Sequence, residues 1–113
     1  MDEEMDVAVL GTLLEDDCSR TILEATAQEP KSADDLVGRC AASRATVYRR
    51  LDELERHGLV DVRQRPDADG HHYKVYAAVL DRAVVSLTSD GIELSVSRRN
   101  RMTDRLRRFV EDL

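Results

Sequence analysis

The sequence predicts one α+β domain, with helices in its first half and two β-hairpins followed by a last helix in its second half. Three observations carry this prediction. Apolar residues recur at helical spacing as far as residue 57, alternate with polar ones after Gly58, and return to helical spacing over the last 13 residues. A chain of 113 residues can bury one modest core.

The first predicted helix spans about residues 5–27, with a break at Gly11 left open. Its apolar stripe consists of Val7, Leu10, Leu14, Cys18, Ile22 and Ala25. Pro30 ends this helix, because the residue before a proline disfavours helical geometry.

Two shorter helices follow, and each begins at a serine. Ser32 is a hydroxyl cap with a carboxylate three residues later, and the helix after it runs to about Cys40. Ser43 is the second cap, and Gly58 has the character of a glycine just beyond a helix end. The apolar face of this second helix consists of Val47, Leu51 and Leu54.

Two hairpins are expected next. The first has strands at residues 59–65 and 72–79, joined by a polar turn at residues 66–70. The second centres on Asp90-Gly91, interpreted as the two central residues of a type I′ turn. That register pairs apolar with apolar residues, Leu87 with Leu94 and Val85 with Val96.

Residues 101–113 form the last predicted helix, which is amphipathic. The chain then divides into residues 1–80, a three-helix core with a β-wing, and residues 81–113, a hairpin and a helix that extend it. Three helices followed by a two-stranded hairpin is the order of a winged helix-turn-helix.

The run SADDLVGRCAASRATVYRRLDELERHGLV, residues 32–60, resembles the helix-turn-helix of ArsR-like transcriptional regulators and is similar to those of halophilic archaea. It contains an apolar short helix, a tight turn, a serine cap, a Thr-Val pair and a Leu-x-x-Leu stretch that leads into Gly-Leu-Val. The resemblance implies a regulator of transcription that binds double-stranded DNA as a homodimer. The sequence has no glycine-rich phosphate loop, no nucleophile with a base at a recognisable spacing and no cofactor fingerprint, so neither an enzyme nor a cofactor is expected. Metal-sensing relatives carry a Cys-x-Cys motif or Asp/His sets that this sequence lacks, so no metal site is expected.

The helix at about residues 43–57 is the expected recognition helix. A helix of this length fits the major groove and presents its first turns to base edges. Arg44 and Arg49 are expected to read bases, since arginine bonds guanine bidentately, and Arg50 is expected to contact phosphate from the side. The residues left for DNA are Ser43, Arg44, Ala45, Thr46, Tyr48, Arg49 and Arg50. The alternative is a solvated face whose arginines are balanced by the acids of the same helix, and for Arg50 both interpretations stand equally.

Residues 60–79 form the expected wing, whose cations Arg63, Arg65 and Lys74 would approach a minor groove or a phosphate strand. Asp67 and Asp69 at its tip weaken that expectation. The neighbours His71 and His72 point to opposite faces of a strand, which disfavours a metal site formed by that pair.

Charge and hydropathy narrow the class of protein further. Residues 1–35 hold 11 acids and two bases, whereas residues 36–113 hold 12 acids and 15 bases, so an anionic partner is expected in the second part. The excess of acids, with 15 arginines and only two lysines, resembles proteins of extreme halophiles. With no apolar run of about 18 residues and an acidic start, we expect a cytoplasmic protein that does not enter a membrane.

Two apolar stripes are expected to form a dimer seam. They consist of Val7, Leu10 and Leu14 near the start, and of Met102, Leu106, Phe109 and Val110 in the last helix. The alternative is that the last helix only covers the second hairpin of its own subunit. Cys18 and Cys40 are expected to pack in the core.

Two rival functions stay open at this point. Net acidity favours a winged-helix module that binds another protein and lacks specific DNA binding. The second rival is a DNA-binding regulator switched by oxidation of Cys18, and a small effector molecule is also left open.

Overall fold

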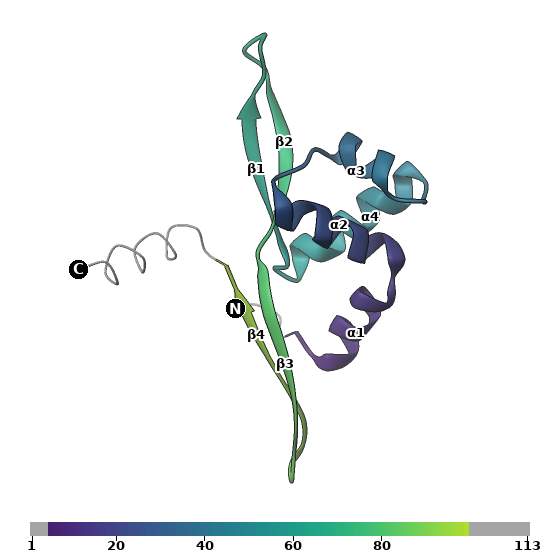
Figure 1. Ribbon diagram of the computed structural model, residues 1–113, viewed down its shortest axis with the longest axis vertical. Helices are drawn as coiled ribbons and strands as arrows, with labels where there is room; N and C mark the ends of the chain where they lie inside the picture. Colours follow the sequence, from purple (N-terminus) through teal and green to yellow (C-terminus); the bar gives the residue numbers. More distant parts are fainter. Residues whose placement is uncertain (1–4, 100–113) are drawn as a thin grey trace, which may run out of the picture.

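The computed structural model describes residues 5–99, and the helix predicted at residues 101–113 lies outside them. Four helices come first, α1 (Val7–Glu15), α2 (Asp17–Gln28), α3 (Ala33–Arg39) and α4 (Arg44–Arg56). Two antiparallel hairpins follow, β1 (Val60–Pro66) with β2 (His72–Ala78), and β3 (Leu80–Thr88) with β4 (Gly91–Arg98). Figure 1 shows that the hairpins extend in opposite directions from the helical body. The predicted α+β winged-helix fold is confirmed.

The segment predicted as one helix over residues 5–27 consists of two helices, and the break falls at Asp16 instead of Gly11. Asp16 has an extended backbone (φ −77°, ψ 126°), and its Oδ2 accepts a hydrogen bond from the Ser19 N–H at 2.8 Å. An aspartate in this position starts a new helix by capping it, whereas a single glycine inside a helix costs only about 1 kcal/mol and is tolerated. The prediction of one continuous helix was therefore wrong, and the break that was left open at Gly11 does not occur there.

The hydrophobic core centres on α4. Val47, Leu51 and Leu54 are each at most 1% exposed, so the predicted core face of this helix is confirmed. Ile22 of α2 and Leu36 of α3 belong to the same cluster and are fully buried. The opposite side of α4 is consequently the side that faces outward.

Both predicted serine caps are present. Ser32 Oγ accepts from the Asp35 N–H at 3.2 Å, and Ser43 Oγ accepts from the Thr46 N–H at 3.1 Å. Beyond the end of α4, Gly58 has φ +72°, a conformation that a glycine adopts without strain. These local signals set the length of α4 within a residue of the prediction.

The β1–β2 hairpin agrees with the two predicted wing strands. Its inner half packs on the helices, where Val75, Tyr76 and Ala77 are buried, and its outer half is exposed. The Lys31 N–H donates to the Tyr76 carbonyl at 3.0 Å, and the Tyr76 N–H donates to the Lys31 carbonyl at 2.7 Å. β2 is therefore held on both edges, by β1 and by the segment before α3.

The β3–β4 hairpin exists as predicted, but its register differs. The pairs are Leu87 with Ile92, Val85 with Leu94 and Ala83 with Val96, and Thr88 with Gly91 closes the turn. Ser89 and Asp90 are thus the turn residues, and neither has a positive φ, which a type I′ turn requires. Apolar residues still meet on one face, because moving the partner by two positions leaves every side chain on the same face.

Candidate nucleic-acid interface

The outward side of α4 carries the candidate base-reading residues. Arg44, Ala45, Tyr48 and Arg49 are exposed, and Thr46 is half-buried. Because Val47 is completely buried between them, the backbone of α4 cannot rotate to hide this side without opening the core. The exposed side can therefore meet a partner as one rigid surface.

Arg44 is held at its position by a residue that the sequence analysis missed. Arg44 Nη1 lies 2.7 Å from Asp34 Oδ1, an ion pair between the start of α4 and the start of α3. The pKa of Arg44 is raised first by Asp34 and then, to a smaller extent, by the neighbouring Tyr48 hydroxyl. Ten residues separate the partners, and the sequence offers no periodicity that would pair them.

The guanidinium group of Arg49 is held by a weaker contact than that of Arg44. Its Nη2 lies 3.4 Å from Thr46 Oγ1, which also accepts a hydrogen bond from Ser43 Oγ at 3.0 Å. No acid pairs with Arg49 within residues 5–99. Of the two arginines expected to read bases, Arg49 therefore needs to break the weaker contact before it can bind.

Arg50 pairs with acids of its own chain, which supports the alternative given for this residue, and a phosphate contact at Arg50 stays a prediction. Arg50 Nε lies 3.0 Å from Asp16 Oδ2, and its Nη1 lies 3.3 Å from Glu53 Oε1. Its side chain is only 25% exposed. Two acids thus occupy Arg50 inside the fold, and it ties α4 to the junction between α1 and α2.

The wing cations are split between two faces. Arg65 lies opposite Tyr73 and Lys74 opposite Gln64 in the β1–β2 register, and directly opposed residues share a face of the hairpin. Arg63 is half-buried and lies on the same face as Arg65, whereas Lys74 lies on the other face. Arg65 and Lys74 are both exposed, but they cannot contact one strand of DNA from the same side of the wing.

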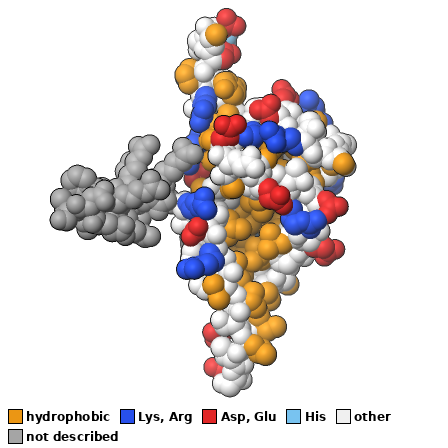
Figure 2. Space-filling model, in the orientation of Figure 1, with side chains coloured by type: hydrophobic (Ala, Val, Ile, Leu, Met, Phe, Trp, Pro, Cys, Tyr) orange, Lys and Arg blue, Asp and Glu red, His pale blue; other side chains and the backbone are white. Residues whose placement is uncertain are grey.

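Acidic and basic side chains alternate over the helical body in Figure 2, with no broad basic patch on the face shown. This mixture agrees with a net charge of −6 for the chain. Any affinity for nucleic acid must then come from individual placed side chains more than from a general positive field.

Helix α3, the turn after it and the exposed side of α4 have the arrangement of a DNA-reading motif. Residues 14–63 match the sequence family described as the helix-turn-helix domain. These residues are similar to a helix-turn-helix domain, in agreement with the observed fold of α2, α3 and α4. The match includes α2, α3, α4 and the first half of β1. No curated protein matches the chain at a significant level.

The tip of the wing, outside residues 14–63, carries a cluster of acidic and histidine side chains that was not predicted from the sequence. The ligand atoms of Asp67, Asp69 and His71 all lie within 4.8 Å of one another, and all three residues are exposed. Asp67 Oδ1 accepts from the N–H groups of Asp69 and His71, both at 2.9 Å. These hydrogen bonds account for the cluster as the geometry of a tight turn.

The two cysteines pack between α2 and the turn of the helix-turn-helix domain. Both are buried, as expected, and Cys40 Sγ lies 3.8 Å from the Cys18 carbonyl oxygen. Burial, together with Cys40 and then the charge of Asp16, raises the pKa of the Cys18 thiol to about 12. Since the thiolate is the form that oxidants attack, Cys18 is a slow nucleophile in this fold.

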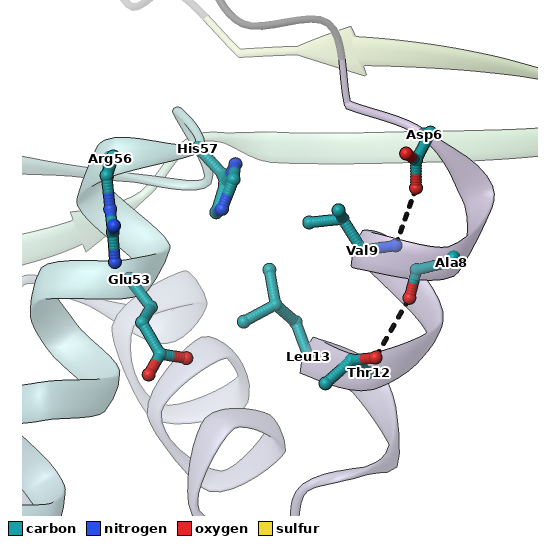
Figure 3. A pocket seen from close by; sticks show the side chains of 8 residues that line it. All are labelled: Asp6, Ala8, Val9, Thr12, Leu13, Glu53, Arg56 and His57. Carbon is teal, nitrogen blue, oxygen red and sulfur yellow. Dashed lines mark hydrogen bonds between the residues drawn. The ribbon is translucent and has the colours of Figure 1, made fainter.

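A pocket of about 340 Å³ lies between α1 and the end of α4. Figure 3 shows Val9 and Leu13 of α1 facing Glu53 and His57 across it. The His57 Nδ1 atom is buried and has no hydrogen-bond partner among residues 5–99. The volume is near the lower limit of pockets that hold small molecules.

The residues expected at a dimer seam divide into three groups. Val7 and Leu14 are each 37% exposed, whereas Leu10 is buried in the core of its own subunit, so the expectation that Leu10 lies on a free stripe was wrong. Helix geometry explains this, since Leu10 and Leu13 turn inward together. The expected seam residues Met102, Leu106, Phe109 and Val110 lie outside the described residues.

The apolar face that the sequence predicted for the second hairpin is exposed over the outer part of β3–β4. Leu87 is 83% exposed, Ile92 60% and Val85 58%. They share one face of the hairpin, and the base of that face, at Ala83 and Leu94, packs against the core. Within residues 5–99, no helix is long and apolar enough to cross a bilayer.

Proposed function

We propose that the chain regulates transcription by binding a specific sequence of double-stranded DNA as a homodimer. Residues 43–57 would enter the major groove, and residues 60–79 would lie alongside it as a wing. The observation that carries this proposal is the exposed side of α4, where Arg44, Ala45, Tyr48 and Arg49 project from a helix whose other side is fully buried.

The finer identity of the protein is also a proposal. The motif over residues 32–60 supports an ArsR-like regulator, and the acidic, lysine-poor composition supports an organism that lives in concentrated salt. Arginine suits such conditions, because its planar guanidinium binds through short-range paired hydrogen bonds that salt screens less than long-range attraction.

The same proposal assigns a different role to each of the two parts of the chain. Residues 1–80 would bind DNA, and residues 81–113 would join two copies. The exposed apolar face at Val85, Leu87 and Ile92 supports a role in association, since monomers rarely expose such residues together. A two-fold dimer would read a palindromic site.

One observation favours the rival function, a module that binds another protein. Arg44, Arg50 and Arg56 each pair with an acid of the same chain, which lowers the positive charge that the interface offers to DNA. The thiol switch has less support, because burial raises the pKa of Cys18 to about 12. A small effector would find its most suitable cavity between α1 and α4.

Fluorescence anisotropy separates these functions. The purified chain is titrated against a labelled duplex of its own promoter region and against a scrambled duplex of equal length. The proposal expects binding at least about 1,000-fold tighter to the true site, which is the lower end of specificity for DNA regulators. Equal affinity for both duplexes would favour the protein-interaction module.

A further inference from the structure

The segment that follows α4 is joined to the base of the second hairpin through three consecutive carbonyl groups. The Leu59 carbonyl accepts a hydrogen bond from the Leu80 N–H at 3.2 Å. The Gly58 carbonyl accepts from Arg98 Nε at 2.8 Å, and the His57 carbonyl accepts from Arg98 Nη2 at 3.1 Å. Leu80 and Arg98 are paired residues at the base of β3 and β4. Both strands of this hairpin therefore hold the end of α4.

Arg98 and Gly58 fit each other closely. Gly58 has φ +72°, and a Cβ atom built on it would lie 3.0 Å from Arg98 Nε. A side chain at position 58 would therefore strain the backbone and press on the guanidinium group. A guanidinium group also suits the end of a helix, where the last carbonyl groups carry partial negative charge. The joint thus depends on a glycine and an arginine that lie 40 positions apart in the sequence.

Arg98 restrains the angle of the joint, which the other contacts control less well. Apolar packing of Ala83 and Leu94 on the core holds the base of the hairpin, but such packing has no preferred direction. The single acceptor at Leu59 fixes a position, about which α4 and the hairpin can still tilt. The planar guanidinium of Arg98 donates to two neighbouring carbonyls at once, and such a fork fixes a direction as well as a distance.

This angle is important because the proposed function gives the two joined parts different tasks. In that proposal α4 reads one half of a palindrome, and residues 81–113 join two copies. The two reading helices of a dimer must then match half-sites that lie about 34–36 Å apart, or one turn of DNA. Moving one half-site by one base pair shifts it by about 3.4 Å and rotates it by about 35°. A rigid joint rejects the altered site, whereas a loose joint accepts it.

We propose that Arg98 determines which half-site spacing a dimer of this chain accepts. Arg98 is a positioning residue, since it acts on DNA through the angle between α4 and the part of the chain that joins two copies. The inference rests on the proposed function and adds a determinant of specificity that lies outside the matched residues 14–63. The ligand is a palindromic duplex with one preferred distance between its halves.

The test compares duplexes that differ only in spacing. The two halves of the palindrome that the chain selects from a random library are kept, and one or two base pairs are inserted or removed between them. Fluorescence anisotropy measures the affinity for each duplex. For the unmodified chain, a change by one base pair should weaken binding at least about 10-fold, as a mismatched base pair does. In Arg98→Gln this penalty should fall about 10-fold, because two hydrogen bonds of ordinary net strength are lost.

Arg99→Gln is the matched control. Arg99 is the next residue, and its ion pair stays inside the hairpin, where its Nε lies 3.2 Å from Asp81 Oδ1. This variant should keep the spacing preference of the unmodified chain. Arg98→Lys keeps the charge but loses the planar fork, so its spacing penalty should lie between those of the unmodified chain and Arg98→Gln. Light scattering and urea unfolding show whether each variant is a folded dimer before it is titrated.

The outcomes separate the inference from the function on which it rests. A weaker spacing preference in Arg98→Gln, with the same preferred half-site sequence and an unchanged preference in Arg99→Gln, supports the inference. It is refuted, while DNA binding stands, if the unmodified chain accepts every spacing equally or if Arg98→Gln keeps its preference. An equal loss of affinity at every spacing, or a monomeric Arg98→Gln, would also refute it, since Arg98 would then support only the fold or the dimer. If the unmodified chain binds neither the palindrome nor its scrambled form, the proposed function fails, and the inference fails with it.

Discussion

Arg50 Nε of the recognition helix lies 3.0 Å from Asp16 Oδ2, the carboxylate that separates α1 from α2. The contact joins the helix proposed to read DNA to the N-terminal pair of helices. Asp16 also caps α2 through Ser19, so one side chain both starts a helix and holds its neighbour. The orientation of α4 is thus set by a residue 34 positions earlier in the sequence.

This ion pair makes part of the stability depend on pH. The Arg50 guanidinium holds the pKa of Asp16 below its usual value of 3.8. As the pH falls, the unfolded chain takes up its proton first, so the stabilisation is complete above pH 3.8 and is lost as the pH falls through the lower pKa of the folded state. Asp16→Asn keeps a capping side chain but removes the charge, and it should cost about 1 kcal/mol at pH 7.

Urea unfolding of the unmodified chain and of Asp16→Asn at pH 7 and pH 2.5 measures this difference. The two should converge at the lower pH. Asp17→Asn is the matched control, because Asp17 is 94% exposed and, within the described residues, pairs with Arg20 alone. A difference between the unmodified chain and Asp16→Asn that is as large at pH 2.5 as at pH 7 would mean that the charge of Asp16 is not what stabilises the fold.

The neighbours Arg49 and Arg50 offer a second matched pair. Arg49→Ala should weaken binding to the specific duplex by about 1–3 kcal/mol and binding to scrambled DNA by less, as expected of a base contact. Arg50→Ala should instead lower the free energy of unfolding, since it leaves Asp16 without its partner. Anisotropy and urea unfolding are measured on both variants. An equal loss of affinity for both duplexes in Arg49→Ala would reduce Arg49 to a phosphate contact.

Asp34 restrains Arg44 and places a negative charge beside the DNA. Asp34→Asn should therefore strengthen DNA binding, by about 2- to 5-fold, which is the range of a surface ion pair. Asp35→Asn is the control, because Asp35 follows directly in the sequence and is exposed without an ion pair within residues 5–99. Weaker binding by Asp34→Asn than by the control would show that Asp34 positions Arg44 for contact.

The two faces of the β3–β4 hairpin provide the test of dimerisation. Val85 is 58% exposed on the apolar face, and its neighbour Val84 is 45% exposed on the other face, opposite Ser95. Val85→Glu should weaken the dimer at least about 10-fold, because a buried interface would have to accept an unpaired charge. Val84→Glu should leave the dimer intact. Light scattering at several protein concentrations measures both, and a monomer for the unmodified chain would contradict the account.

Local patterns predicted the fold well because each depends on residues that are near one another in the chain. The serine caps, the buried face at Val47, Leu51 and Leu54, and the change to strand spacing after Gly58 are all of this kind. The observed register of the second hairpin could not be predicted from the apolar pattern, because two registers keep the same apolar face. Turn geometry alone decides between them.

The candidate site could be predicted only in part for a related reason. The exposed side of α4 follows from its buried side, but Asp34 beside Arg44 and Asp16 beside Arg50 depend on how separate helices pack. The same packing places Tyr48 and Tyr73 in the lining of one groove, and no spacing in the sequence predicts this arrangement.

The central claim is that the exposed side of α4 reads a DNA sequence. The most direct measurement is selection of bound duplexes from a random library by the full chain, followed by anisotropy on the enriched sequence and its scrambled form. The account predicts one enriched palindrome that is bound at least about 1,000-fold more tightly than the scrambled duplex, with this preference reduced in Arg49→Ala. No enriched sequence, or a preference that Arg49→Ala leaves unchanged, would contradict it.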